Sequence, residues 1–174
     1  MVDSNLLPTI SWCSRCLYPS SSAVPLVFDE AGVCSGCRVH DQKSEINWSD
    51  RLDMLLDDLD GYRRSSGYEC VIGVSGGKDS YYQVHFVKEV LGLNPLLVTY
   101  NGNNYLDVGW QNLHNMKKVF GVDHLIISPS VDMLVRMNRL GFIKTGDMNW
   151  HAHCGIFTQP MKVAAQQNIP LVFW

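Results

Sequence analysis

The feature that most constrains the fold is a repeated alternation of short apolar runs with longer amphipathic segments from residue 69 onward. The apolar runs are rich in β-branched or aromatic residues, which favour strands. They lie at residues 70–74, 95–100, 124–129 and 170–174. The segments between them are expected to be helices and lie at residues 80–91, 107–120, 131–140 and 154–167. This alternation predicts an α/β fold with a Rossmann-like parallel sheet covered by helices on both faces.

Three details refine this prediction. Gly92 and Gly121 stand where helix C-terminal stops are expected. Pro160 falls inside the last predicted helix and is expected to kink or break it, because proline has no N–H to donate. The fourth apolar run reaches Trp174 with no turn after it, the pattern expected of a chain truncated inside its α/β domain.

The loop that follows the first predicted strand has the sequence Ser-Gly-Gly-Lys-Asp-Ser at residues 75–80. It is not a Walker A loop, because Ile72 stands where that motif needs its first glycine and Asp79 follows the lysine. It is not a dinucleotide fingerprint either, because no G-x-G-x-x-G register exists around Gly73. A glycine-rich turn without a ligand is the remaining structural alternative.

The composition of this loop favours a phosphate ligand. Its glycines let the backbone wrap closely around an anion, and the following helix presents free N–H groups. Lysine and serine add donors, whereas Asp79 is unfavourable beside phosphate unless a cation such as Mg²⁺ lies between them. The predicted nucleotide-binding residues in the loop are Ser75, Gly76, Gly77, Lys78, Asp79 and Ser80, with catalytic roles for Lys78 and Asp79.

The loop resembles the PP-loop of the N-type ATP pyrophosphatases, whose signature is S-G-G-x-D-[ST] after the first strand. The match is complete over residues 75–80. The resemblance implies an adenine nucleotide alpha-hydrolase-like domain that cleaves ATP between its α- and β-phosphates. The substrate oxygen becomes adenylylated, and a nitrogen or sulfur nucleophile then displaces AMP.

Four of the six cysteines form two Cys-x2-Cys pairs in a segment, residues 11–40, without a sustained helical period. Such pairs let four thiolates converge on one Zn²⁺ ion, which stabilises a segment too small to build an apolar core. An iron–sulfur centre is the second possibility, and free cysteines are the third. The predicted metal ligands are Cys13, Cys16, Cys34 and Cys37.

The pattern predicts three parts. Residues 1–46 form a four-cysteine zinc ribbon, residues 47–67 a connecting helix, and residues 68–174 the ATP pyrophosphatase domain. Asn47 or Ser49 is expected to cap the connecting helix.

A four-cysteine ribbon before a PP-loop, with the sequence HAHCGIFTQPMKVAAQQNIPLVFW further on, resembles the N-acetyl sugar amidotransferases. The resemblance covers the whole chain but about the N-terminal half of a typical family member. It implies that ATP and Mg²⁺ activate the acetamido oxygen of a nucleotide-linked N-acetyl sugar. Ammonia then forms an acetamidino sugar for bacterial surface polysaccharide, the O-antigen. Separate glutaminase and cyclase-like subunits are the implied source of ammonia.

Two alternative functions stay open. The first is a PP-loop tRNA-thiolating enzyme, for which Cys154 is the candidate sulfur carrier because Cys70 falls inside a predicted core strand. The second is a nucleotide-binding module without catalysis. A net charge of −3 gives no electrostatic support for nucleic-acid binding.

Further candidates follow the second strand and precede the last helix. Residues 99–103 are expected to contact adenosine, with Tyr100 and Asn101 as the predicted ligands, unless this segment is only a polar turn. His151, His153 and Cys154 are candidates for metal binding, proton transfer or sugar contact, and Lys144 and Asp147 are weaker candidates.

The sequence contains no apolar run of membrane-spanning length and no signal-peptide pattern at its start. Its proportions, 46% hydrophobic and 18% charged residues, are those of a folded globular chain. The sequence therefore predicts a cytoplasmic protein.

Overall fold

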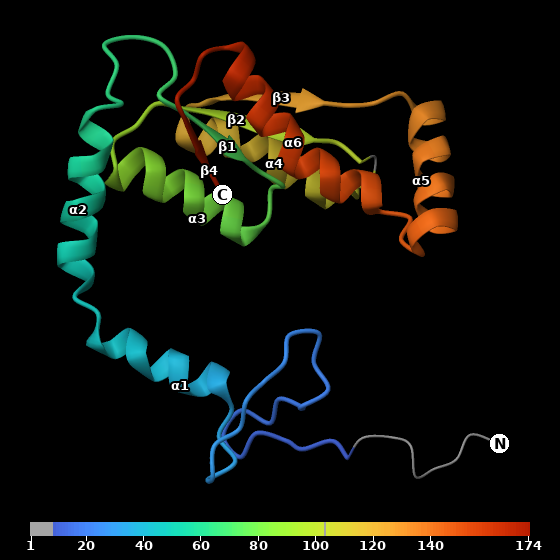
Figure 1. Ribbon diagram of the computed structural model, residues 1–174. Coiled ribbons are helices and arrows are strands. Elements are labelled where there is room, and N and C mark those ends of the chain that lie inside the picture. Colours follow the sequence, from blue (N-terminus) through green and yellow to red (C-terminus); the bar gives the residue numbers. More distant parts are fainter. Residues whose placement is uncertain (1–8, 103) are drawn as a thin grey trace. The chain divides into compact units, whose positions relative to one another are not determined.

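The computed structural model describes residues 9–102 and 104–174, which belong to two compact units (Figure 1). The division falls between Met54 and Leu55, inside helix α2 (Trp48–Asp60). We call the part before it the four-cysteine module and the part after it the α/β unit.

The α/β unit is built on a four-stranded parallel sheet. The strands are β1 (Cys70–Gly73), β2 (Pro95–Tyr100), β3 (Asp123–Ile127) and β4 (Leu171–Phe173). Their order is β3-β2-β1-β4, and each pairing is parallel. The predicted α/β fold is confirmed. The chain adds β2 and β3 on one side of β1 and then returns to add β4 on the other side. Parallel sheets of this kind bind ligands in the crevice beyond the carboxyl ends of the strands where the order reverses, here β1 and β4.

Helices occupy both faces of the sheet. The crossovers between β1, β2 and β3 contain α3 (Lys78–His85), which continues as the π-helical turn η3 (Phe86–Val90), and α4 (Asp107–Phe120). The return to β4 contains α5 (Val131–Thr145) and α6 (Trp150–Gln166). Right-handed crossovers in opposite directions place α3 and α4 on one face and α6 on the other. Accordingly, α6 packs on β1, β2 and β4.

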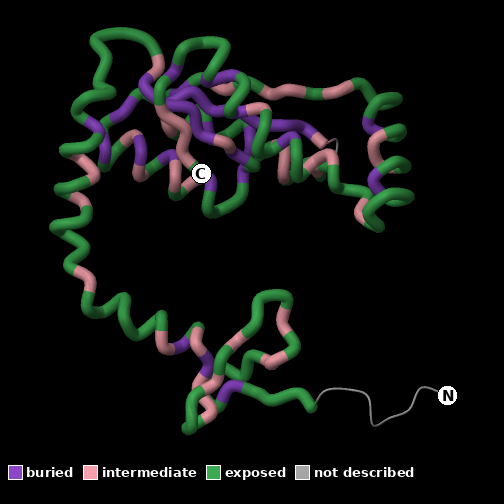
Figure 2. Tube along the Cα trace, in the orientation of Figure 1, coloured by how far each residue is buried: buried purple, intermediate pink, exposed green. Residues whose placement is uncertain are grey.

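The core lies around the two central strands (Figure 2). All six residues of β2 are buried, whereas the edge strands β3 and β4 are largely half-buried. Side chains alternate across the sheet. The face toward α6 contains the buried cluster Val71, Leu96, Val98, Val163, Ala164 and Ile169.

The helix boundaries differ from the sequence prediction at two points. Helix α3 begins at Lys78 rather than near residue 80, so Lys78 and Asp79 belong to its first turn. Helix α6 begins at Trp150 and runs past Pro160 without a break, so of the kink or break predicted there the break is wrong. The Pro160 ring is fully buried, and this burial offsets the missing backbone hydrogen bond. The predicted stops at Gly92 and Gly121 are confirmed, since both have a positive φ.

The four-cysteine module has little regular structure. Two isolated antiparallel bridges join Trp12 to Pro19 and Phe28 to Cys34. Helix α1 (Ser35–Gln42) and the 3-10 turn η2 (Lys43–Glu45) follow. The sequence pattern missed α1, because its cap is a cysteine: the Cys34 side chain accepts a hydrogen bond from the backbone N–H of Cys37.

Helix α2 begins after Asn47, whose Oδ1 accepts hydrogen bonds from the backbone N–H groups of Ser49 and Asp50. Of the two caps predicted, Asn47 is the one used. Among the residues that the structure describes, no helix has the length and apolar character needed to cross a membrane.

Candidate functional site

The loop after β1 turns sharply at Gly76. Its φ is +79°, and a Cβ at this position would lie 3.1 Å from the backbone nitrogen of Leu113 on α4 and 3.2 Å from its Cα. Only glycine avoids both the backbone strain and the steric clash. The close approach of α4 to Gly76 therefore fixes the path of the loop.

Ser75 and Ser80, the first and last residues of the loop, contact each other. The backbone N–H of Ser75 donates to Ser80 Oγ at 3.0 Å, and the two hydroxyl oxygens lie 3.3 Å apart. Ser80 is buried, whereas Ser75 is exposed. Ser80 therefore stabilises the loop, and Ser75 presents its hydroxyl to solvent or to a ligand.

The two charged residues of the loop lie in the first turn of α3. The Nζ of Lys78 lies 2.7 Å from Asp79 Oδ1, and their side chains are 90% and 86% exposed. Such an exposed pair contributes little stability. Gly77 is the N-cap and offers no side-chain acceptor, so the first N–H groups of α3 have no cap. Both charges and the open helix end are accessible to an anion accompanied by a cation.

A cavity of about 240 Å³ lies at this edge of the sheet. Its wall includes residues from the loop, the end of β2 and the segment after β4, among them Ser75, Asp79, Ser80, Tyr100, Tyr105 and Trp174. A Cβ on Gly73 would lie 2.6 Å from the Trp174 ring, so this glycine allows the indole to lie against the end of β1. We call this space the loop cavity.

A second cavity, of about 340 Å³, adjoins the first. The two share Ser75, Tyr100, Tyr105 and Ile156. The second cavity also contacts the first turns of α6 through Asn149, Ala152 and His153. We call it the adjoining cavity.

A hydrogen-bond chain beneath the loop ties three strands together. Thr99 Oγ1 donates to the Val74 carbonyl oxygen at 2.6 Å and lies 2.8 Å from His124 Nε2. Since the hydroxyl has one proton, His124 must donate its Nε2–H to Thr99. Burial lowers the pKa of His124 to about 4, with smaller contributions from His114 and Lys117. The imidazole is therefore neutral near pH 7 and holds the residue that precedes Ser75.

The two predicted adenosine contacts after β2 have different surroundings. Tyr100 lines the loop cavity and the adjoining cavity, and burial raises the pKa of its phenol. Asn101 is buried and donates from Nδ2 to Ser128 Oγ at 3.0 Å, at the end of β3. Thr99 belongs to the chain beneath the loop, and Asn103 lies outside the described residues.

The polar residues at the start of α6 separate into two groups. Tyr100 Oη lies 3.2 Å from His151 Nδ1, whereas His153 Nδ1 lies 3.4 Å from Asp147 Oδ2. Cys154 is exposed. His151, Cys154 and Lys144 line a third cavity, between α5 and α6, and His153 lines the adjoining cavity.

Sequence reasoning missed several residues that line the loop cavity. Tyr105 follows the polar segment after β2, and an aromatic residue at this place was the available signal. Trp174 and Ile156 come from segments far away in the chain. Only the strand order brings them to the loop, and the local sequence contains no signal for that proximity.

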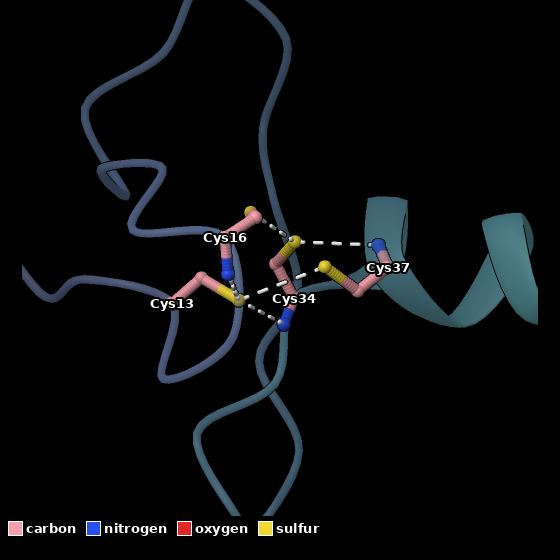
Figure 3. A group of neighbouring side chains, drawn as sticks. All are labelled: Cys13, Cys16, Cys34 and Cys37. Carbon is pink, nitrogen blue, oxygen red and sulfur yellow. Dashed lines mark hydrogen bonds between the residues drawn. The ribbon is translucent and has the colours of Figure 1, made fainter.

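The second candidate site is the cysteine cluster of the four-cysteine module (Figure 3). The Sγ atoms of Cys13 and Cys37 lie 3.9 Å apart, and those of Cys16 and Cys34 lie 3.7 Å apart. All four sulfurs lie within 4.8 Å of one another. Four sulfurs bound tetrahedrally to one zinc ion at about 2.3 Å are about 3.8 Å apart. The spacing therefore fits a single metal ion.

Backbone N–H groups surround the cluster. Cys13 Sγ accepts from the N–H groups of Arg15, Cys16 and Cys34, and the bonds from Cys16 and Cys34 are the main reason why the pKa of Cys13 is lowered to about 6. Burial, followed by contacts with the other thiols, raises the pKa of Cys37 to about 12. The N–H groups favour thiolate at Cys13, and a metal ion would supply the charge that Cys37 needs to ionise.

Comparison with known proteins places the fold. The chain matches no protein-family model. It is 26% identical over 117 residues to the uncharacterized protein MJ1599 of Methanocaldococcus jannaschii, which covers 67% of this chain and 42% of that protein. The chain thus spans less than half the length of this curated relative.

Among solved structures, the NH3-dependent NAD synthetase of Campylobacter jejuni aligns with a TM-score of 0.51 and 14% identity, over 72% of this chain and 56% of that chain. The NMN synthetase of Francisella tularensis (TM-score 0.45, 16% identity, 72% and 53% covered) and the U34-tRNA thiolase of Methanococcus maripaludis with its 4Fe–4S cluster (TM-score 0.43, 15% identity, 95% and 54% covered) align less well.

The α/β unit therefore has a fold like that of NAD synthetase, and a four-cysteine module precedes it in the chain. The α/β fold and the four-cysteine module predicted from the sequence are confirmed. The narrower resemblance to the N-acetyl sugar amidotransferases remains a hypothesis.

Proposed function

We propose that the chain is the ATP-binding part of an AMP-forming N-acetyl sugar amidotransferase. The observation that carries the proposal is the position of the Ser-Gly-Gly-Lys-Asp-Ser loop at the carboxyl end of β1, beside the point where the strand order reverses. Gly76 is packed against α4, and the open end of α3 follows directly.

The loop is suited to bind the pyrophosphate part of ATP. The uncapped N–H groups of α3, the Ser75 hydroxyl and the Lys78 ammonium donate to phosphate oxygens. Asp79 lies on the same turn and is free to rotate from Lys78 toward a Mg²⁺ ion, which neutralises the leaving pyrophosphate when bound. The aromatic residues Tyr105 and Trp174 of the loop cavity offer surfaces for the nucleoside.

The proposed reaction has two steps. The acetamido oxygen of the sugar attacks the α-phosphorus of ATP, the bond to the bridging oxygen breaks, and pyrophosphate leaves. Ammonia then adds to the activated carbon, AMP departs with the former acetamido oxygen, and loss of protons gives the acetamidino group. The first step needs positioning and charge stabilisation rather than a general base. The ammonia is proposed to come from glutaminase and cyclase-like partner subunits.

The four-cysteine cluster is proposed to hold a structural zinc ion. The sulfur spacing supports one ion rather than a 4Fe–4S cube, in which each thiolate binds a different iron and the sulfurs are spread farther apart. Four protein ligands leave no open position for substrate. Elemental analysis of the purified protein should find about one zinc per chain and no stoichiometric iron or sulfide.

The activity is tested by incubating the protein with ATP, Mg²⁺, ammonium and UDP-linked N-acetyl sugars. The expected products are AMP, pyrophosphate and a sugar whose mass has decreased by the difference between an oxygen atom and an NH group. ATP binding without AMP formation, with every sugar and nitrogen source, would instead identify a nucleotide-binding module without catalysis.

Replacement of Asp79 tests the role of the loop. Asp79→Ala should reduce AMP formation by at least about a hundredfold, because the variant loses the proposed Mg²⁺ ligand, while the far-UV circular dichroism spectrum stays unchanged. Asp132→Ala is the matched control, since Asp132 is also an exposed acidic residue in a first helical turn but lines none of the cavities described above. Retained activity in Asp79→Ala would refute the assignment of the loop.

Sulfur transfer to tRNA is the second candidate function. Its support is Cys154, an exposed thiol in a cavity that Tyr100 also lines. A parallel assay with unmodified tRNA and a sulfur donor distinguishes the two. Thiolated tRNA that disappears in Cys154→Ser, together with no amidinated sugar, would favour the second candidate.

A further inference from the structure

The third cavity, between α5 and α6, has no role in the reaction as described so far. It encloses about 460 Å³, within the range of about 300–1,000 Å³ usual for ligand pockets. The α5 wall contributes Met137, Leu140 and Lys144, and the α6 wall contributes Trp150 and His151. We call it the α5–α6 cavity.

Two glycines set the shape of the α5–α6 cavity. A Cβ on Gly141 would lie 2.6 Å from the Asp147 carbonyl oxygen and 3.4 Å from Trp150 Cβ. A Cβ on Gly155 would lie 2.5 Å from the Tyr100 ring. The first glycine lets the turn between the helices approach α5, and the second lets α6 lie directly on Tyr100. Trp150 is thus held beside α5, and the end of β2 forms part of the wall.

The chemistry of the wall indicates the kind of ligand. Trp150 is 53% exposed, and Met137 and Leu140 add apolar surface. Among the described residues that line the cavity, Lys144 is the only one with a permanent charge, and none is aspartate or glutamate. An indole surface with a lysine and no carboxylate suits a planar ring attached to an anion, the combination found in a nucleotide.

The α5–α6 cavity is connected to the ATP site through one residue. Tyr100 lines the loop cavity, the adjoining cavity and the α5–α6 cavity. Its hydroxyl group contacts His151, which is also on the α5–α6 side. Tyr100 is therefore a wall common to the adjoining cavity and the α5–α6 cavity, and a ligand made of two linked parts would pass this side chain to occupy both.

We propose that the α5–α6 cavity binds the nucleoside diphosphate of a nucleotide-linked sugar, with its base on Trp150 and its diphosphate near Lys144. The sugar then occupies the adjoining cavity, where Asn149 and His153 face it and Ser75 marks the boundary with the loop cavity. This inference rests on the proposed function, because it assigns the second substrate of that reaction.

Calorimetric titration of the protein with UDP tests the inference, first without ATP and then with a saturating non-hydrolysable ATP analogue and Mg²⁺. UDP should bind under both conditions, because its site is separate from the PP-loop. Trp150→Ala and Lys144→Gln should each weaken UDP binding by about tenfold or more, the usual effect of losing a base stack or a charge-assisted contact. Binding of the ATP analogue should not change in either variant.

Two controls make the result specific. Lys118→Gln removes an exposed lysine from α4, outside the α5–α6 cavity, and should leave UDP binding unchanged. Asp79→Ala should also leave it unchanged, because Asp79 lies in the PP-loop. Circular dichroism spectra like that of the wild type show that the variants are folded.

The outcomes separate this inference from the proposed function. Binding of the ATP analogue without any binding of UDP would overturn the inference and leave the ATP site intact. Competition between UDP and the ATP analogue would also overturn it, because UDP would then occupy the PP-loop. UDP binding that depends on Trp150 and Lys144, with no binding of ATP, would support the cavity and refute the proposed function.

Discussion

The two units of this chain are stabilised by different means. In the α/β unit, the central strands and the helices that cover them bury aliphatic side chains completely, for example Ile72, Leu97 and Leu113. In the part of the four-cysteine module that the structure describes, the buried residues are Cys13, Cys34 and Cys37. The sulfur atoms occupy the place where the other unit has its apolar core.

This difference follows from chain length and explains what each unit requires. A segment of this size buries too little apolar surface to offset its conformational entropy. The module even leaves Trp12, Leu17 and Val24 largely exposed. With the proposed zinc ion bound, the module therefore depends on four metal–sulfur bonds, whereas the α/β unit depends on the burial of its strands.

Removal of the metal should give the largest difference between the units. A strong chelator, or the substitution Cys37→Ser, should unfold the module, because apparent binding energies of structural zinc are about 10–16 kcal/mol. The α/β unit should remain folded. Hydrogen exchange followed by mass spectrometry should show full exchange in peptides from residues 9–46 and unchanged protection in β1 and β2.

Cys154→Ser is the matched control, since it removes an exposed thiol from the other unit. It should retain the metal and the exchange pattern of the wild type. Unchanged protection of the module after complete metal loss would show that apolar contacts of Leu26, Phe28 and Val33 suffice. The conclusion that the two units are stabilised by different means would then be wrong.

The different means of stabilisation also explain how well the sequence predicted the structure of each unit. The strands of the α/β unit were predictable because a buried parallel strand is a continuous apolar run, as in β2. Helix α1 was missed, because its N-terminus is set by a cysteine that caps it and clusters with three others. The unbroken course of α6 at Pro160 was not predicted, because it depends on burial of the ring in the folded unit.

The residues of the candidate site also fall into those that the sequence predicted and those that it missed. The loop at residues 75–80 is contiguous in sequence, so its composition alone indicated phosphate chemistry. Tyr105 and Trp174 reach the same cavity from other segments, and their proximity follows from the strand order β3-β2-β1-β4. The Thr99–His124 contact likewise joins neighbouring strands and has no local sequence signal.

A second test concerns the packing of the α/β unit at its loop. Gly76→Ala and Gly67→Ala both place a side chain at a positive φ, but only at Gly76 does the Cβ meet another element, the backbone of α4. Gly67→Ala should lower the free energy of unfolding by about 1 kcal/mol, and Gly76→Ala by about 2–4 kcal/mol, because overpacking adds to backbone strain.

Urea unfolding measures both free energies, and titration with ATP measures binding at the proposed nucleotide site. Gly76→Ala should lose ATP binding, while Gly67→Ala should retain it. Metal content should be unaffected in both, because neither glycine belongs to the module. Equal destabilisation by the two substitutions would mean that α4 moves away from the loop at little cost.

The smallest expected effect is the response of the α/β unit to acid. In the module, protons would compete with the proposed zinc ion for the thiolates, which is a separate effect of acid. In the α/β unit, His124 has a folded pKa of about 4 and an ordinary value of 6.5, so the unfolded state binds more protons between these values. The free energy of unfolding should therefore decrease as the pH falls through this window, and this contribution should become constant below the folded pKa.

The size of this effect is on the order of 1 kcal/mol, because His124 is only partly shielded from solvent. Urea unfolding between about pH 7 and about pH 5 should show the decrease in the wild type. His124→Gln should lack it, since glutamine does not titrate yet keeps an N–H donor for Thr99 Oγ1. An identical pH dependence in the variant would assign the acid sensitivity to other groups. The hydrogen bonds among Val74, Thr99 and His124 would then not depend on a neutral imidazole, and packing would stabilise this part of the sheet.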